Sequence, residues 1–275
     1  MQLAGKILYR IARHWIAGTR LADAIMIAKE LNKRGIKVLI NYLGENVVRR
    51  EGAENILAEY SRLLKAIGSL HLNADITIKL TQFCLHPDSK YCHSSLAKLL
   101  QLAKKRKIFV WFDMEDSKHV ETTIELYLAL LKNYPGIGIT VQAYLKRSRR
   151  DMAKILSHKG VVRLVKGAYR GDYAWREDID RNYLKLMRIL FSKAQRFSIA
   201  THDERLIAAV QKLNTRYKRN VEYDVLYGIK DDLTAKLAAG GNNVAVYLPY
   251  GNEWKAYALR RIRERKRNIL LLLHL

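Results

Sequence analysis

The sequence predicts an α/β protein, a single (β/α)8 barrel domain over residues 1–275, because two kinds of segment alternate along the whole chain. Short runs rich in β-branched residues are separated by longer runs with helical periodicity, a pattern typical of parallel βαβ units. Eight such runs in this length favour a closed barrel over an open doubly wound sheet, which is the alternative. The motif Gly136-Ile-Gly138 stands at the start of a predicted strand and not after one, so it is not the dinucleotide-binding loop expected of that alternative.

The predicted strands follow one another without a change in composition that would mark a second domain. They are Ile36–Asn41, Ile76–Leu80, Ile108–Phe112, Ile137–Val141, Val161–Val165, Phe197–Ala200, Val221–Val225 and Val244–Tyr247. Helical periodicity is clearest over Glu51–Ile67, Ser94–Lys105, Val120–Lys132 and Arg181–Ala194. Residues 1–35 also look helical, and we expect them to cap the bottom of the barrel. A helix after the last strand is expected to lie over the active-site face of a distorted barrel.

Composition predicts a reducing cytoplasmic environment. With 49% hydrophobic residues the chain can bury a sizeable core. Two cysteines, Cys84 and Cys92, do not make a disulfide framework. The first residues lack the apolar region of a signal peptide, and no apolar run reaches the roughly 18 residues that span a membrane. We therefore expect the protein in the cytoplasm or peripherally on the inner face of the cell membrane.

The formal charge of +24 predicts an affinity for anionic partners. Basic residues cluster at Lys146–Arg150, Arg216–Arg219 and Lys255–Arg267, but no zinc-finger spacing, RNA-recognition signature or clear helix-turn-helix accompanies them. We therefore expect a basic surface suited to transient contact with an anionic membrane, and no nucleic-acid partner. The apolar segment Ile269–Leu275 could pack on a partner or a bilayer surface.

The strongest local motif lies near the end of the chain, where Tyr257, Arg260, Arg261 and Glu264 recur at helical spacing. That spacing puts the four side chains on one face of a helix. Two adjacent guanidiniums suit bidentate binding of a carboxylate, with the tyrosine ring as a wall beside it. The motif predicts a site for a small anionic ligand; a solvated basic face is the alternative.

Seven successive predicted strands end in side chains that can carry charge, hydrogen-bond or stack, with one leucine among them. Because active sites of (β/α)8 barrels lie at the C-terminal ends of the strands, these residues are expected to share one cleft. They are Lys79, Asp113, Gln142, Lys166, Thr201 with His202, Leu226, and Tyr247.

Several longer motifs occur in an order and spacing that resemble the proline dehydrogenase family. They are Arg163-Leu-Val-Lys-Gly-Ala-Tyr169, Val141-Gln-Ala-Tyr-Leu145, Ala200-Thr-His-Asp203, Leu226-Tyr-Gly228 and Leu248-Pro-Tyr-Gly…Tyr257-x-x-Arg-Arg261. The segment Ile16-Ala-Gly…Leu43-Gly-Glu45 is similar to the start of the single-function bacterial and archaeal forms. The resemblance covers roughly residues 15–268.

The resemblance implies an enzyme that oxidises L-proline to Δ1-pyrroline-5-carboxylate, the first step of proline catabolism, by hydride transfer to FAD, and then reduces a membrane quinone. Carried over to this chain, it implies that the substrate carboxylate binds Lys79, Arg260 and Arg261. Asp113 would orient these cations and separate their charges. The walls around the pyrrolidine ring would be Leu226, Tyr247 and Tyr257.

For the cofactor, the resemblance implies that Gln142 and Arg163 contact the isoalloxazine, with Arg163 near its reactive nitrogen. The ribityl-pyrophosphate part would be held by Lys166, Gly167, Ala168, Tyr169, Thr201 and His202. Glu264 would reach the distal part of the flavin. Lys79, Asp113 and Arg163 are the residues implied in catalysis.

Other readings of the sequence stay open at this point. Glu222-Tyr-Asp224 stands where the family usually has Phe-Gln before Leu226, a change expected to affect packing more than chemistry. Cys84, His86, Cys92 and His93 are plausible metal ligands, but their spacing matches no established zinc pattern, and we expect no metal. A non-catalytic polyanion-binding barrel that kept the motifs by descent is the alternative function.

Overall fold

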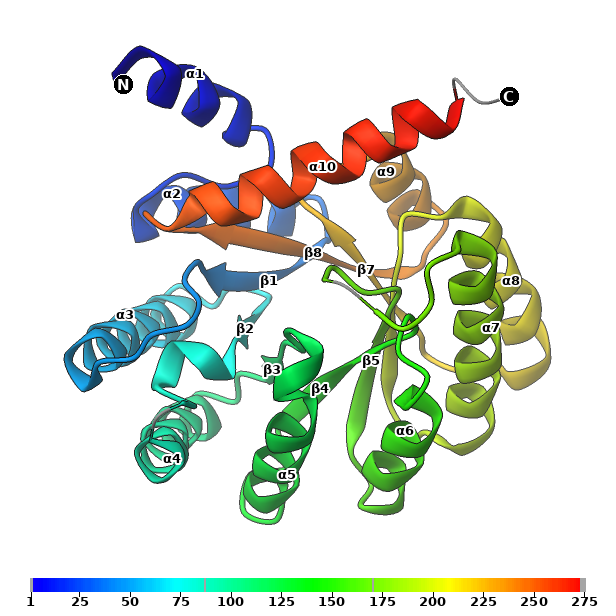
Figure 1. Cartoon of the computed structure of the whole chain (residues 1–275), viewed down its shortest axis with the longest axis horizontal. Coiled ribbons are helices and arrows are strands. Elements are labelled where there is room, and N and C mark those ends of the chain that lie inside the picture. Colours follow the sequence, from blue (N-terminus) through cyan, green and yellow to red (C-terminus); the bar gives the residue numbers. More distant parts are fainter. Residues whose placement is uncertain (1, 87, 170, 273–275) are drawn as a thin grey trace.

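A computed structural model describes the backbone of residues 2–86, 88–169 and 171–272 and the side chains of residues 7–86, 88–169 and 171–263. Within these residues, eight parallel strands form a closed barrel in chain order, with the first strand paired to the last (Figure 1). The predicted (β/α)8 fold is therefore confirmed. The strands are β1 (Lys37–Tyr42), β2 (Ala74–Ile78), β3 (Val110–Phe112), β4 (Ile137–Gln142), β5 (Val161–Val165), β6 (Phe197–Ala200), β7 (Glu222–Leu226) and β8 (Asn243–Tyr250).

Helices between successive strands cover the outside of the barrel (Figure 1). In the first of them, buried residues recur at helical spacing, from Ala53 and Ile56 to Tyr60, Leu63 and Ile67, so one apolar face packs on the strands. The helices are α3 (Arg50–Ser69), α4 (Ser89–Lys105), α5 (Val120–Leu131), α6 (Ser148–Ser157), α7 (Arg176–Lys193), α8 (Glu204–Tyr217) and α9 (Asp231–Ala239), with the short 3-10 helices η1 (Leu80–Phe83) and η2 (Ser117–His119).

The apolar core lies mainly between the strands and the surrounding helices, whereas the barrel interior is largely polar. The interior holds a small apolar cluster of Leu39, Trp111 and Ala245. At the N-terminal end of the strands, the Lys37 ammonium lies 2.9 Å from Glu222 and also pairs with Asp75. A barrel interior filled by side chains is a packed layer and not a channel.

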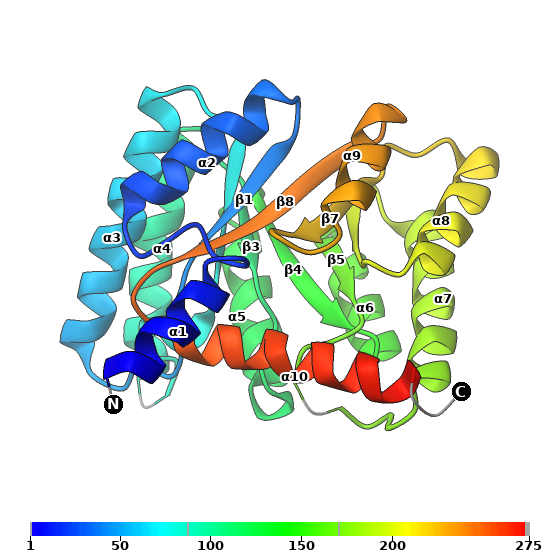
Figure 2. The same ribbon diagram turned by 90° about the horizontal axis from the view of Figure 1, so that it is seen from above.

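The N-terminal helices do not cap the bottom of the barrel as expected. Helix α2 (Leu21–Lys33) packs against the outside of β1 and β8, and α1 (Gln2–Ala12) packs on α10 (Trp254–Leu272). The segment between α1 and α2 is tied to the C-terminal end of β8, since the Ala17 N–H donates to the Pro249 carbonyl at 2.9 Å. Because α10 crosses the active-site end of the barrel (Figure 2), α2 covers the outer faces of β8 and β1 in its place.

The last strand is longer than the sequence pattern predicted. It runs to Tyr250, and Pro249 lies within it opposite Asn41 of β1. Proline lacks a backbone N–H and is confined in sheets mainly to edges, strand ends and bulges, so its place within β8 is unusual. The Pro249 carbonyl accepts a hydrogen bond from the Ala17 N–H. Because β8 continues to Tyr250, Tyr247 lies inside the strand, and its hydroxyl donates to Asp113. Similarly, β2 ends at Ile78, and Leu80 belongs to η1.

Candidate active site

Asp113, directly after β3, is the centre of a hydrogen-bond network at the C-terminal end of the barrel. One carboxylate oxygen accepts from the Thr77 hydroxyl at 2.8 Å and from Arg163 Nη1 at 3.3 Å. The other accepts from the Tyr247 hydroxyl at 2.7 Å and lies 4.0 Å from the Lys79 ammonium. Burial, followed by the Asp113 charge, raises the pKa of Tyr247 well above its ordinary value, so its hydroxyl remains a donor. Barrel closure thus gathers four strands around one carboxylate.

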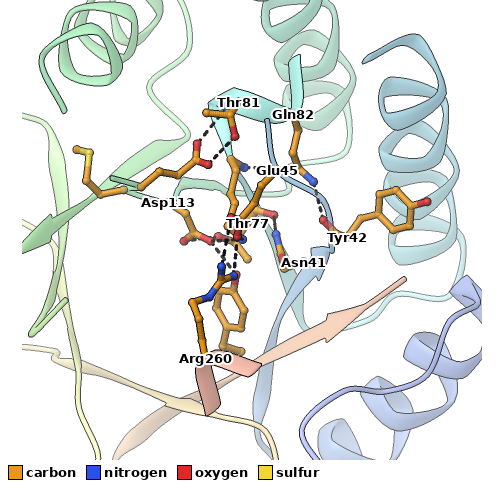
Figure 3. Close-up of polar contacts among 12 residues, drawn as sticks. Asn41, Tyr42, Glu45, Thr77, Thr81, Gln82, Asp113 and Arg260 are labelled. Carbon is orange, nitrogen blue, oxygen red and sulfur yellow. Dashed lines mark hydrogen bonds and ion pairs between the residues drawn. The ribbon is translucent and has the colours of Figure 1, made fainter. Parts of the chain in front are cut away.

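Glu45, just after β1, joins this site to the C-terminal helix (Figure 3). Its carboxylate accepts two hydrogen bonds from the Arg260 guanidinium, at 2.6 and 3.2 Å, and one from the Tyr169 hydroxyl at 3.2 Å. The Lys79 ammonium lies 3.8 Å away. Burial would raise the pKa of Glu45, but Lys79 and Arg260 outweigh it and lower the pKa. An ionised carboxylate therefore fastens α10 over the end of the barrel.

Glu45 is absent from the site residues predicted from the sequence. Those residues lie at the ends of the second to eighth strands and none follows the first, although Leu43-Gly-Glu45 is part of a family motif. The available signal was the position alone, because a carboxylate after β1 must lie at the same barrel end as Lys79 and Asp113.

Arg260 and Arg261 have different surroundings although they are adjacent in α10. The guanidinium carbon of Arg260 lies 5.4 Å from the centre of the Tyr169 ring, and that of Arg261 lies 5.3 Å from the centre of the Tyr257 ring. Adjacent helical residues point about 100° apart, which separates the two groups. Both are mostly buried, Arg261 at 8% exposure, so the solvated basic face considered from the sequence is not what forms here.

His202, after β6, is a neutral histidine whose tautomer follows from its contact. Its Nε2 accepts from the Leu226 backbone N–H at 2.9 Å, so the ring proton is assigned to Nδ1. Burial, and next the charge of Arg261, lowers the pKa of His202 to about 4. Nδ1 is buried and has no hydrogen-bond partner among the described residues.

Lys166, after β5, already has anionic partners. Its ammonium lies 2.9 Å from Asp203 and also pairs with Asp180. The Asp203 backbone N–H donates to the Thr201 hydroxyl at 3.1 Å. Burial would raise the pKa of Asp203, but hydrogen bonds from Lys166 and Arg176 outweigh it and lower the pKa. This ionised cluster fixes the loops after β5 and β6 against each other.

Gly167 is required by the side chain packed against it. It adopts a φ of +126°, and a Cβ there would lie 1.7 Å from the Tyr144 ring. Ala168, the next residue, is exposed, and Tyr169 turns back to Glu45. The Lys166–Tyr169 segment therefore lies between the cluster around Asp203 and the site around Glu45.

Arg163 and Gln142 lie within the strands β5 and β4 themselves, deeper in the barrel than the residues that follow the strand ends. The Arg163 guanidinium is 3% exposed and stacks on Trp111, with its carbon 4.4 Å from the ring centre. Its Nη2 has no partner among the described residues. Gln142 Nε2 donates to the carbonyls of Met114 and Glu115 at 3.1 Å each, which leaves its Oε1 without a partner in the same part of the chain.

Among the described residues, three buried polar atoms on β4, on β5 and just after β6 thus lack hydrogen-bond partners, namely Gln142 Oε1, Arg163 Nη2 and His202 Nδ1. Buried polar groups are almost always hydrogen-bonded, because leaving one unpaired costs about 1–3 kcal/mol. Two donors and one acceptor in this region fit a polar organic group that offers both kinds of atom.

The remaining candidates do not form a second site. Cys84 and Cys92 are buried, and burial raises the pKa of the Cys92 thiol to about 12, which makes it a poor metal ligand. His86 Nε2 lies 3.0 Å from His119 Nδ1, at a cleft of about 380 Å³ beside the site that also includes Thr81 and Lys118. Across the described parts of the chain, no group of three or more His, Cys, Asp or Glu side chains could hold a metal ion. The Glu264 side chain lies outside the described residues.

Comparison with known proteins agrees with this fold and site. Residues 24–269 match the family model for proline dehydrogenase. Proline dehydrogenase 2 of Bacillus subtilis is 32% identical, over 95% of this chain and 92% of its own length, and proline dehydrogenase of Deinococcus radiodurans is 32% identical, over 97% and 90%. The crystal structure of proline utilization A (PutA) from Bdellovibrio bacteriovorus, inactivated by N-propargylglycine, matches with a TM-score of 0.85 at 23% identity, covering 94% of this chain and 33% of that one. That likeness is one of fold.

The fold and site define a (β/α)8 barrel with a cluster of ion-paired cations and carboxylates at the C-terminal ends of its strands, and the comparisons make it an oxidoreductase. The chain belongs to the proline dehydrogenase family. It is an enzyme of that kind, acting in proline catabolism, and the family name gives proline as the substrate. The non-catalytic barrel that the charge allowed is thereby set aside.

Proposed function

We propose that this proline dehydrogenase oxidises L-proline to Δ1-pyrroline-5-carboxylate at the C-terminal end of its barrel, with FAD as its cofactor and a membrane quinone as the final electron acceptor. The observation that carries the proposal is the convergence of Lys79 and Arg260 on one partly buried carboxylate, Glu45. A site that already neutralises a carboxylate with two cations has the chemistry to bind the carboxylate of an amino acid.

In this proposal, Lys79, Arg260 and Arg261 bind the proline carboxylate, and Asp113 holds Lys79 and Arg163 in place. Asp113 is suited to that task because its two oxygens are already fixed by Thr77 and Tyr247. Apolar surfaces of Leu226, Tyr247 and Tyr257 would enclose the ring, since a proline-sized ligand needs one charged anchor and apolar walls.

For the cofactor, the unpaired atoms of Gln142, Arg163 and His202 support an isoalloxazine and a ribityl-pyrophosphate chain nearby. FAD, when bound, supplies the oxidation by accepting the hydride that proline loses. Arg163 would offset negative charge gained by the cofactor, since its guanidinium is buried and fixed. Lys166, Gly167, Ala168, Tyr169 and Thr201 would line the phosphate end, and Glu264 is assigned to the distal end.

A transient contact with an anionic membrane would bring the enzyme to its quinone. Supporting features are the exposed Ile7 and Ile11 on α1 and Leu259 on the adjoining α10, with the exposed Arg10 and Arg13 nearby in sequence. Exposed apolar and cationic side chains together favour binding at a lipid surface. The described residues include no helix long and apolar enough to cross a membrane.

An anaerobic visible absorption spectrum, recorded before and after L-proline is added, tests the proposal. Flavin bands that bleach with L-proline are the expected result, because cofactor, substrate and direction of electron flow are then shown together. Flavin bands that persist would overturn the assignment of substrate. A colourless protein that takes up no added FAD would overturn the assignment of cofactor.

A further inference from the structure

Asp224 of β7 is a buried carboxylate bound directly to Arg163, although the difference from the family pattern at this position was expected to affect packing more than chemistry. Arg163 Nε donates to its Oδ2 at 2.7 Å, which is shorter than the 3.3 Å contact between Arg163 and Asp113. Asp224 is 4% exposed, so this contact is shielded from solvent. A guanidinium held between two carboxylates and stacked on Trp111 has one orientation.

The charged and polar neighbours of Asp224 come from three other strands, from its own strand and from α7, where burial and then the charge of Asp224 raise the pKa of Tyr183. Ser198 on β6 donates to the same carboxylate oxygen at 2.8 Å, and Oδ1 has no hydrogen-bond partner among the described residues. Arg163 faces it from β5, Glu222 lies two residues earlier on β7, and Lys37 acts on it from β1. One cation is therefore in direct contact, while Glu222, whose charge also acts on Asp224, is paired with Lys37.

We propose that Asp224 is a positioning residue that holds the Arg163 guanidinium and sets how much of its positive charge acts on the bound flavin. The proposal rests on the proposed function, in which Arg163 lies beside that cofactor. When Asp113 and Asp224 are both ionised, the three groups carry a net charge of −1. When Asp224 is protonated their net charge is zero, and the guanidinium acts more strongly on a negative charge nearby.

The protonation of Asp224 is poised to change near neutral pH. Burial, acting against the charge of Arg163, raises the pKa of Asp224 to about 7. Reduction adds negative charge to a flavin, so an ionised Asp224 opposes reduction and a protonated one does not. The reduction potential should therefore carry the signature of this carboxyl group.

The test compares the flavin midpoint potential of the wild type and Asp224→Asn by reductive titration against a reference dye, without proline. Near pH 8.5, the variant should favour the reduced flavin about tenfold more than the wild type, which is about 30 mV for a two-electron couple. Near pH 5.5, below the pKa of about 7, the two potentials should converge. Equal potentials at both pH values, or a difference that does not vary with pH, would overturn the proposal.

Glu222→Gln is the matched control, because it removes the same charge two residues away on the same strand, at the Lys37 end of the interior. In Glu222→Gln, the equilibrium constant for flavin reduction should stay within about twofold of the wild-type value, because charge effects weaken with distance. An effect equal to that of Asp224→Asn would overturn the specific role of Asp224. If Asp224→Asn does not fold, Ser198→Ala replaces it. Loss of that donor should move the pH-dependent part of the potential to higher pH, and an unchanged profile would count against the proposal.

A second measurement needs no cofactor, so it separates failure of this proposal from failure of the proposed function. The folded pKa of Asp224 exceeds that of an unfolded aspartate, about 3.9. The protein should therefore lose unfolding free energy, relative to Asp224→Asn, as the pH rises from about 4 through about 7. Parallel pH profiles of urea unfolding would overturn the titration of Asp224 even if the protein bound no flavin.

Discussion

At the level of single residues, the site already contains a carboxylate where the substrate's carboxylate is proposed to bind. Glu45 occupies Arg260 and lies 3.8 Å from Lys79. Proline must therefore share these cations with Glu45 or displace it. If proline displaces Glu45, that carboxylate is left without its cation. The free-energy cost offsets much of the attraction between the substrate carboxylate and the cations, so charge alone adds little affinity for proline. Selectivity then depends on how well the ring walls fit.

Arg260→Ala should weaken proline binding by about 1.5–3 kcal/mol, the scale for losing a charged hydrogen-bond partner. The effect follows because Glu45 is then left without its main cation, which adds repulsion toward the substrate. Binding is measured by spectral titration of the flavin, whose content should be unchanged. Arg263→Ala, an exposed arginine on the same helix, is the control and should bind proline as the wild type does. Normal affinity in Arg260→Ala would remove Arg260 from the carboxylate site.

His202 should make folding stability depend on pH in the acid range. Burial lowers its folded pKa to about 4, below the unfolded value of about 6.5, so the unfolded state binds more protons in that interval. Relative to His202→Asn, the wild type should lose up to about 3 kcal/mol of unfolding free energy as the pH falls from about 6.5 to about 4. Urea unfolding at several pH values measures this. Curves that stay parallel across the interval would contradict a buried neutral histidine.

At the level of elements, the barrel interior depends on one glycine opposite one tryptophan. A Cβ at Gly138 of β4 would lie 2.4 Å from the Trp111 ring, and Trp111 supports the Arg163 guanidinium. The close approach of β3 and β4 side chains therefore needs a residue without a side chain. The stacked position of Arg163 is built on this contact.

Gly138→Ala should destabilise the protein by about 1–3 kcal/mol, the usual range for overpacking a core. Gly136→Ala is a matched control two residues away, because a Cβ there meets no heavy atom within 4 Å. Urea unfolding of both variants gives the comparison. Equal stabilities would mean that Trp111 moves aside without penalty.

The positions of α2 and α10 differ from those expected from their order in the chain. Helix α10 follows β8 yet lies over the active-site end, while α2 precedes β1 and covers the wall between β8 and β1. Buried Ala24 and Ala28 give α2 a smooth face for close packing on the strands. Trp254, at the start of α10, contacts Tyr9 of α1 with ring centres 5.2 Å apart. The lid over the site is thus built from both ends of the chain.

For the whole molecule, the charge of +24 is the property most relevant to a membrane partner. Lys79 and Arg163 at the barrel and Arg260 on α10 are paired with carboxylates. The surplus must therefore lie outside these pairs. A surplus of this kind produces a long-range attraction to anionic lipid that salt screens.

Vesicle sedimentation tests this attraction. The enzyme should bind vesicles that contain anionic lipid at about 0.01 M salt, where the screening length is about 30 Å, and dissociate at about 1 M, where it is about 3 Å. Vesicles of neutral lipid are the control and should retain little protein. Equal binding to both kinds would attribute the association to apolar side chains, such as Ile7 and Ile11, and not to charge.

The sequence by itself determined the barrel and the end of it that holds the site. Alternating periodicity is a local property, and a polar residue at the end of a strand falls at a known end of the barrel, so the sequence predicts Lys79 and Asp113 as site residues. Helical spacing, which is also local, predicts Arg260. Only the tertiary structure decided that Glu45 pairs with Arg260, 215 residues away, and that Asp224 pairs with Arg163, 61 residues away. It also decided that α2 covers the outer faces of β8 and β1. Such pairings depend on which strands become neighbours when the barrel closes, and no spacing along the chain records that.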